Sequence, residues 1–221
     1  AIKAAKVLGI TLTKRANGSA AHIELAGFPY HALDTYLPKL IRFGLRVAIC
    51  EQLEDPKKTK QIVKRGVTEL VTPGVAINDK ILDHKQNNFL AAIAFDKRTT
   101  GVAFLDVSTG EFLVAEGQAN YIEKLMQSFQ PSETIFAKPE TQKFKEQIGS
   151  NFYTYTLDDW VFGKDYALEK LLTHFKVSSL KGFGIEELEV ANIAAGAILH
   201  YLNENQLSNL NQITNIQRIA K

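Results

Sequence analysis

The 221-residue sequence has a single cysteine and no long apolar run, and both absences exclude classes of protein. Cys50 has no second cysteine to pair with, which excludes an internal disulfide framework and a cysteine-rich zinc site. The longest unbroken apolar run is Phe89–Phe95, far short of the ~20 residues of a membrane-spanning helix. No secretory signal pattern is visible. With 45% apolar and 23% charged residues, the composition fits a globular cytoplasmic protein of one large domain or two small ones.

Several catalytic and metal-binding patterns are also missing. No two histidines stand four residues apart, as a helical metal site requires. No glycine-rich loop ends in Gly-Lys-Ser or Gly-Lys-Thr, so nucleotide binding of that kind is excluded. The Gly-x-Ser-x-Gly motif of serine hydrolases is absent as well. Cys50 lies in a short apolar strand, where we expect a buried structural thiol rather than a nucleophile.

The overall charge is weak, but it is unevenly distributed along the chain. The formal net charge is +2. Residues 1–68 hold 12 Lys and Arg against 5 Asp and Glu, a net charge of +7, whereas residues 69–221 hold 14 against 19, a net charge of −5. A basic front piece points to nucleic acid or another anionic surface. Chance fluctuation of charge between short segments is the alternative explanation.

Basic residues cluster at two places in this front piece. Lys14 and Arg15 stand where a predicted strand meets a tight turn, so both side chains can reach outward. The second cluster follows the helix-start signal at residues 55–56 and consists of Lys57, Lys58, Lys60, Lys64 and Arg65. Positions 57, 60 and 64 share one face of a helix, and such a face can neutralise phosphates. A solvated helix face without a ligand is the alternative, and none of these residues reads a base edge by itself.

The first residues of the front piece already show the spacing of an amphipathic helix. Ile2–Leu8 indicates the end of an amphipathic helix that stops at Gly9. We therefore expect the chain to be a fragment that has lost residues from its front. Apolar spacing then predicts a helix over 33–43, with Pro38 in or near its first turn.

The back piece predicts an α/β arrangement. Its pattern begins with three predicted strands, at 89–95, 101–107 and 111–115. The connections between them are short, which favours antiparallel pairing of neighbours. Helices then alternate with strands, in the order 120–129, 134–137, 140–148, 152–156 and 165–175. That order is typical of a ribonuclease H-like sheet. A long helix over 186–205 follows.

Nucleases with such a sheet hold two metal ions with clustered carboxylates, so Asp96 and Asp106 are the candidates for a metal site. Asp96 falls at a strand end, which is typical of a turn residue. Asp106 precedes a Val-Ser-Thr-Gly sequence, where a turn-setting aspartate is the favoured interpretation. The fold alone does not predict nuclease activity.

Short motifs follow one another along almost the whole chain. They are Leu12–Arg15 (LTKR), Ala26–Ala32 (AGFPYHA), Val47–Gln52 (VAICEQ), Val71–Gly74 (VTPG), Leu105–Phe112 (LDVSTGEF), Gly182–Gly184 (GFG) and Ala194–Ala197 (AAGA). Each motif is weak alone. In this order and at this spacing they resemble the bacterial MutS family of DNA mismatch-recognition proteins.

The resemblance implies a division into three parts and an α/β (α+β) fold class. Residues 1–68 would be a truncated, mixed-sheet mismatch-binding domain, residues 69–190 a ribonuclease H-like connector domain without nuclease activity, and residues 191–221 the beginning of a helical core domain. Full-length members clamp mismatched DNA as dimers, exchange ATP and ADP with Mg²⁺ in a separate domain, and recruit MutL partly through the connector. We expect no ATPase domain, catalytic residue or cofactor in this chain, and a monomer.

The resemblance also implies positions near DNA. Lys14 and Arg15 would contact phosphates, and Pro29 or His31 would approach the groove. The alternatives are a structural turn with Tyr30 packed inside and a His31 that caps the next helix. The family's mismatch reader is a Phe-x-Glu motif whose Phe wedges beside the mispaired base, and it belongs several residues before Ala1. The match at residues 144–146 lies in a predicted amphipathic helix, and we interpret it as a coincidence.

Three hypotheses follow. The first is a non-catalytic part of a mismatch sensor that transmits state, docks a partner and binds duplex DNA weakly without mismatch preference. The second is a metal-dependent nuclease that uses Asp106. The third is a protein-interaction module in which only the acidic back piece matters.

Overall fold

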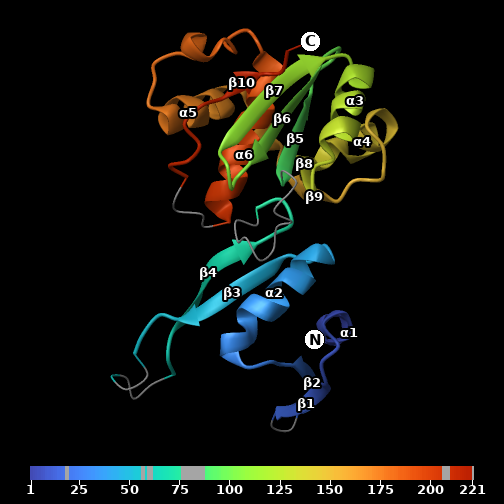
Figure 1. Ribbon diagram of the computed structural model, residues 1–221, viewed down its shortest axis with the longest axis vertical. Coiled ribbons are helices and arrows are strands. Elements are labelled where there is room, and N and C mark those ends of the chain that lie inside the picture. Colours follow the sequence, from blue (N-terminus) through green and yellow to red (C-terminus); the bar gives the residue numbers. More distant parts are fainter. Residues whose placement is uncertain (18–19, 56–57, 59–61, 76–87, 206–209, 221) are drawn as a thin grey trace. The chain divides into compact units, whose positions relative to one another are not determined.

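The computed structural model describes residues 1–17, 20–55, 58, 62–75, 88–205 and 210–220, with the elements labelled in Figure 1. The chain divides into two compact units. The first unit holds residues 1–73, and the second begins at Gly74 and includes the described residues from 88 onward. Among the described residues, no helix is long and apolar enough to cross a membrane.

The first unit is built from helices and two separate two-stranded antiparallel sheets. Its elements are α1 (Ile2–Leu8), β1 (Leu12–Asn17), β2 (Ala20–Ala26), the 3₁₀ helix η1 (Tyr30–Ala32), α2 (Leu33–Arg42), β3 (Val47–Gln52) and β4 (Arg65–Val71). The buried apolar side chains are few: Ala5, Leu8, Leu37, Leu40, Ile41 and Val71. Because a two-stranded sheet buries little surface, most side chains of β3 and β4 remain exposed.

The predicted helix over 33–43 is confirmed as α2. It begins at Leu33, so Pro38 lies in its second turn, next to the first. Proline there removes one intrahelical hydrogen bond, and the burial of Leu37 and Ile41 on either side of it offsets that loss. The expected burial of Cys50 is wrong, because Cys50 is exposed. Along β3 it shares the exposed face with Ala48, whereas Val47 and Ile49 on the other face are partly buried.

The second unit contains a six-stranded mixed sheet in the order β10-β7-β6-β5-β8-β9. Its strands are β5 (Phe89–Phe95), β6 (Thr100–Asp106), β7 (Glu111–Gly117), β8 (Glu133–Ala137), β9 (Thr154–Leu157) and β10 (Gln217–Arg218). Strands β5, β6 and β7 are antiparallel neighbours. Strands β8 and β9 run parallel to β5. The predicted order of strands and crossovers is confirmed.

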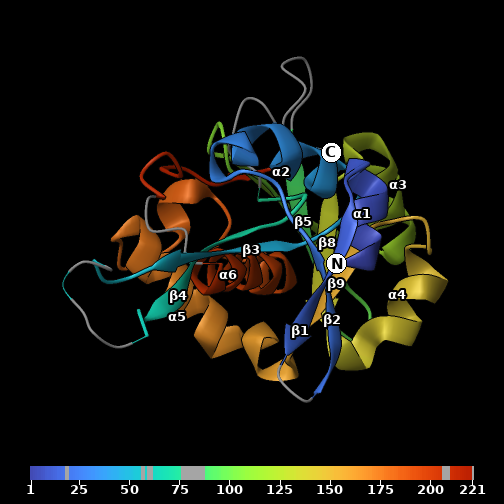
Figure 2. The same cartoon turned by 90° about the horizontal axis from the view of Figure 1, so that it is seen from below.

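Helices cover both faces of this sheet (Figure 2). The helices are α3 (Ala119–Phe129), α4 (Thr141–Gln147), α5 (Lys164–Phe175) and α6 (Glu189–Glu204), with 3₁₀ helices η2 (Lys138–Glu140), η3 (Asp159–Phe162) and η4 (Lys181–Phe183) between them. Along β5, Phe89, Ala91 and Ile93 pack into the α3–α4 layer. Leu90, Ala92 and Ala94 pack into the α5–α6 layer. Coverage on both sides explains why this strand is a continuous apolar run.

Helix α6 belongs to the second unit, although the family resemblance implies a domain boundary at residue 191. That boundary lies inside the helix, whose residues 194–202 are buried without interruption. Glu116 Oε2 accepts hydrogen bonds from the backbone N–H groups of Val190 and Ala191, at 3.0 and 3.3 Å, and thereby caps the helix. A helix that is apolar around most of its circumference is buried, and here the sheet buries it.

The chain that follows α6 also returns to the sheet. Gln212 Nε2 donates to the carbonyl oxygen of Val107 at 2.9 Å. β10 pairs with β7 in parallel, and the Ile219 N–H donates to the carbonyl oxygen of Val114 at 2.8 Å. The described residues from 191 onward therefore complete the second unit instead of beginning a third.

A buried glutamate joins the start of this unit to its interior. Glu133, the first residue of β8, is fully buried. Its Oε1 accepts a hydrogen bond from the Tyr201 hydroxyl at 2.6 Å, and its Oε2 accepts one from the Gly74 N–H at 3.0 Å. A buried carboxylate is stable only when such donors satisfy it. The contacts of Glu133 thus connect β8, α6 and the residue at which the unit begins.

Candidate nucleic-acid interface

The β1–β2 hairpin presents the two predicted phosphate contacts. Lys14 and Arg15 both lie in β1 and are exposed. Neither has an ion-pair partner among the residues that the structure describes. Successive residues of a strand point to opposite faces, so the two side chains do not share one surface. The hairpin offers one cation on each face.

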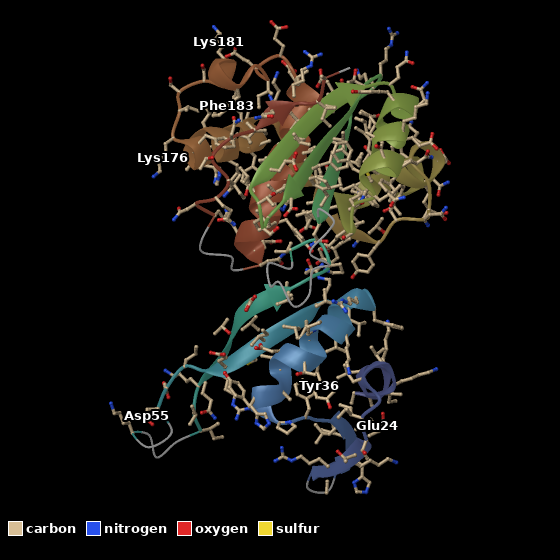
Figure 3. The ribbon with its side chains drawn as sticks, in the orientation of Figure 1. Glu24, Tyr36, Asp55, Lys176, Lys181 and Phe183 are labelled. Carbon is tan, nitrogen blue, oxygen red and sulfur yellow. The ribbon has the colours of Figure 1, made fainter. Side chains whose placement is uncertain are left out.

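The strand register gives these faces different surroundings. Lys14 pairs with Glu24 and Arg15 with Ile23, and Figure 3 shows Glu24 on the hairpin. An acidic residue directly opposite Lys14 reduces the positive potential on that face. We therefore expect Arg15 to contribute more than Lys14 to phosphate binding. The sequence reasoning missed Glu24, because the register depends on an irregularity between Arg15 and Asn17 that no residue pattern reveals.

The loop before α2 carries the other two predicted positions. Pro29 precedes η1, and both Pro29 and His31 are exposed. Tyr30 is 81% exposed, so the alternative in which it packs inside is wrong. The N-terminus of α2 has no side-chain cap, so His31 does not cap it.

An aromatic contact fixes this loop against the helix. The rings of Phe28 and Tyr36 stack with centroids 4.6 Å apart, and Lys39 Nζ lies 5.2 Å from the Tyr36 ring centroid. Figure 3 labels Tyr36 on α2. Stacking of this kind restrains both rings. Phe28 therefore anchors the loop, which leaves the next three residues facing solvent.

The predicted lysine-rich helix is not formed by the described residues. Lys58 lies in a turn, and Arg65 is the first residue of β4. Lys64 lies 3.6 Å from a carboxylate oxygen of Glu54, while Lys57 and Lys60 lie outside the described residues. The segment connects two paired strands, because Gln52 pairs with Arg65. Spacing of lysines alone does not distinguish a helix from such a connection.

Asp106 sets a turn, as predicted. It is 2% exposed. Its Oδ1 accepts hydrogen bonds from the Ser108 N–H at 2.9 Å, the Ser108 hydroxyl at 2.6 Å and the Thr109 N–H at 3.3 Å. Its Oδ2 accepts one from the Asn88 N–H at 3.1 Å. Both oxygens are therefore occupied by donors of the protein itself.

Metal-ligand geometry is absent around the candidate carboxylates. Asp96 is exposed, and its N–H donates to the Thr99 carbonyl in a turn. Within the described part of the chain, no three His, Cys, Asp or Glu side chains are close enough together to hold a metal ion. Two-metal catalysis needs such a cluster.

The second Phe-x-Glu match is buried. Phe144 lies in α4, is 1% exposed and stacks on Phe136 with ring centroids 4.3 Å apart. A side chain packed in the core cannot wedge between base steps. The interpretation of residues 144–146 as a coincidence is therefore confirmed.

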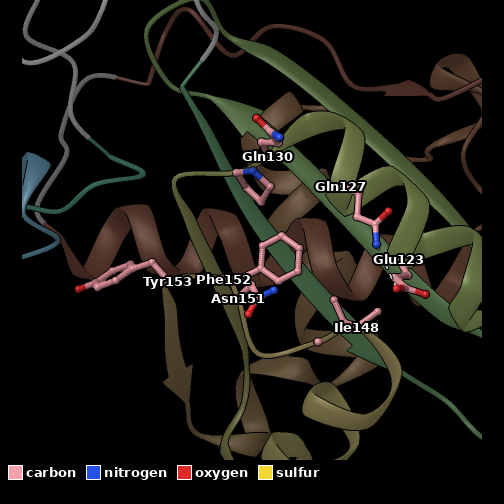
Figure 4. A pocket seen from close by; sticks show the side chains of 9 residues that line it. Glu123, Gln127, Gln130, Ile148, Asn151, Phe152 and Tyr153 are labelled. Carbon is pink, nitrogen blue, oxygen red and sulfur yellow. Dashed lines mark hydrogen bonds between the residues drawn. The ribbon is translucent and has the colours of Figure 1, made fainter.

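A polar cavity of about 470 Å³ lies in the second unit, between α3 and the chain after α4 (Figure 4). Gln127 Nε2 donates to Glu123 Oε1 at 3.1 Å in this cavity, and Phe152 supplies an apolar part of the lining. Glu123 is the only ionisable carboxylate among the lining residues, and none of them is basic. The cavity suits neither phosphate binding nor a nucleophile–base pair.

Comparisons with known proteins match the whole chain. The family model for MutS domain I matches residues 1–80, and that for MutS domain II matches residues 88–214. Curated proteins named DNA mismatch repair protein MutS are 60% identical over all 221 residues in Flavobacterium psychrophilum, Phocaeicola vulgatus and Cytophaga hutchinsonii. The chain spans 25–26% of the length of these relatives.

A much weaker likeness exists to a solved structure of the human cytomegalovirus terminase nuclease domain. It covers 53% of this chain and 83% of that one, at 14% identity and a TM-score of 0.31. A likeness of that strength supports no argument about function.

Proposed function

The chain belongs to the MutS family, and we propose that it is the DNA-proximal and connector part of a DNA mismatch-recognition protein. The first unit would contact duplex DNA. The second would carry information about the bound state and dock the repair partner MutL. ATP, ADP and Mg²⁺ would bind in other parts of the full-length protein. Those parts would also form its dimer interface.

One observation carries the DNA-binding role: Lys14 and Arg15 are exposed and have no ion-pair partner among the described residues, in a piece with a net charge of +7. Exposed cations bind phosphates by releasing counterions, which gives affinity without sequence information. The exposed Pro29 and His31 lie on the loop that Phe28 anchors. The proposed binding is therefore weak and indifferent to mismatches.

We expect the chain to bind a 30-base-pair duplex with a dissociation constant of about 10⁻⁴–10⁻⁶ M at physiological salt. Arg15→Ala should lower the slope of log affinity against log salt by about 1, because one phosphate contact is lost. Lys14→Ala should lower it less, and Lys124→Ala, an exposed lysine of the second unit, should leave it unchanged. Titrations at two salt concentrations with matched and mismatched duplexes measure this. A clear preference for the mismatch would contradict the proposal.

The proposed MutL-docking role rests on the acidic back piece, residues 69–221, with its net charge of −5. If each unit has its own role, Lys14→Ala combined with Arg15→Ala should reduce DNA binding about tenfold or more and leave capture by immobilised MutL unchanged. The unchanged chain and the double variant are compared at equal concentration for their capture by immobilised MutL. Equal loss of DNA binding and capture would contradict the division of roles, and no capture of either protein would refute docking.

We propose no catalytic role for this chain, because both oxygens of Asp106 are occupied. Asp106→Asn should lower the free energy of unfolding by about 1–2 kcal/mol, since an amide nitrogen would face an N–H donor. Neither the unchanged chain nor the Asp106→Asn variant should cleave supercoiled DNA in the presence of Mn²⁺. Cleavage that depends on Asp106 would establish the nuclease instead.

A further inference from the structure

A cavity of about 360 Å³ lies in the second unit, next to the turn that joins β5 to β6. Its lining comes from this turn, from the start of α3 and from α4, and the two helices cover the same face of the sheet (Figure 1). The Asp96 N–H donates to the carbonyl oxygen of Thr99 at 2.8 Å and closes the turn. Small-molecule sites typically measure about 300–1,000 Å³, so the cavity has room for a small ligand.

Three cations line this cavity, although the back piece to which it belongs is acidic. They are Lys97, Arg98 and Lys143, and the lining contains one carboxylate, that of Asp96. The lining therefore has a formal net charge of +2, whereas residues 69–221 have a net charge of −5. A concave site lined by charges of one sign attracts ligands of the other sign. The charge of this lining therefore favours an anion.

Contacts with the protein hold one of these cations in place. Lys143 Nζ donates to the carbonyl oxygen of Asp96 at 3.4 Å and lies 4.8 Å from the Phe95 ring centroid. Its ion pair with Glu140 is longer, at 3.8 Å, and Glu140 is not part of the lining. An aromatic ring attracts a cation without neutralising its charge. Lys143 therefore places a positive charge at a fixed position in the cavity wall.

The other two cations are available to a ligand. Lys97 and Arg98 are exposed and have no ion-pair partner among the described residues. The guanidinium group of an arginine can donate two parallel hydrogen bonds to the oxygens of a phosphate group. Gln118 and Gln147 also line the cavity, and their side-chain amides make no hydrogen bond within the described part of the chain. They supply additional, neutral N–H donors.

We propose that this cavity binds the terminal phosphate group of a small molecule. Such a group carries a charge of about −1.5 to −2 at pH 7 and has three strong acceptor oxygens. These properties match the net charge of +2 and the three cations of the lining. A carboxylate or a phosphodiester of DNA carries only one negative charge and matches less well. The proposal is independent of DNA binding, because the cavity lies outside the first unit.

The test uses inorganic phosphate as the probe, titrated into the ¹⁵N-labelled chain at constant ionic strength. We expect saturable shifts of the backbone amides of residues 97–100 and 118–120, with a dissociation constant of about 1 mM. Dimethyl phosphate, which carries a single charge, should bind about tenfold more weakly. Glycerol 3-phosphate distinguishes the two sources of the group. Tighter binding than that of inorganic phosphate indicates a phosphate ester as the ligand, and equal or weaker binding indicates free phosphate.

Two substitutions of exposed side chains in the turn test the location with opposite signs. Arg98→Gln should weaken phosphate binding about tenfold, because it removes a pair of charge-assisted hydrogen bonds. Asp96→Asn should strengthen binding about threefold, since it removes the negative charge of the lining. Lys124→Gln changes an exposed lysine of the same unit outside the lining and should leave binding unchanged. The proposal would be overturned by the absence of a saturable shift, by shifts centred elsewhere, by equal binding of dimethyl phosphate, or by weaker binding to the Asp96→Asn variant.

Discussion

Replacing Gly101 with alanine should destabilise the second unit by about 3 kcal/mol or more. A Cβ atom at this position would lie 2.3 Å from the carbonyl carbon of Val190 and 2.5 Å from the nitrogen of Ala191. Both are backbone atoms at the start of α6, where Glu116 holds the N–H groups. A shift of α6 would break these hydrogen bonds, and a shift of β6 would break its pairing with β5 and β7.

Urea unfolding followed by tryptophan fluorescence measures this effect. Trp160 is the single tryptophan, and its ring packs against Tyr166 and His200, so it reports on the second unit. Gly182→Ala is the matched control, because a Cβ there meets no atom within 4 Å. A Gly101→Ala protein within 1 kcal/mol of the control would contradict the packing described above.

Replacing Glu133 with alanine should cost about 3–5 kcal/mol. The change removes an acceptor from the Tyr201 hydroxyl and from the Gly74 N–H, and it leaves space inside the core. Tyr201→Phe removes only one of the two donors, and we expect a loss of about 1–2 kcal/mol.

A double-mutant cycle separates the hydrogen bond from the other effects of these changes. The double variant Glu133→Ala with Tyr201→Phe should be more stable than the sum of the single losses predicts, because the hydroxyl without an acceptor is also removed. Glu187→Ala, an exposed glutamate in the same unit, serves as the control. A Glu133→Ala protein as stable as this control would show that the buried contacts contribute little.

The sequence was sufficient to predict five of the six strands of the second unit's sheet, β5 to β9, but not β10. Short connections at 96–99 and 107–110 leave only antiparallel pairing for β5, β6 and β7, and the Asp-Val-Ser-Thr-Gly pattern predicts the turn at Asp106. These features are local, since each depends on residues adjacent in the chain. The predicted bounds of α3 and α5 likewise agree with those in the structure to within one residue.

Features that depend on distant partners could not be predicted. Cys50 lies on the exposed face of β3, opposite the partly buried Val47 and Ile49, and a strand pattern does not show which face of a strand is covered. The lysine spacing near residue 60 is equally compatible with a helix and with a connection between strands. The burial of α6 against β5 and β6 places it in the second unit, whereas its sequence shows only that it must be buried. The sequence predicts Lys14 and Arg15 as candidate contacts, but only their place in β1 shows that the two side chains point to opposite faces.

The short β10 strand also has a consequence for the behaviour of this protein at high concentration. It lies along the outer side of β7 and pairs with Leu113 and Val114. Without it, β7 would present unpaired N–H and C=O groups at the edge of a long apolar sheet, and such edges pair with those of neighbouring molecules. The segment that follows α6 thus protects one edge of the sheet against aggregation. Shortening the chain before residue 217 would affect monodispersity before it affected any binding site.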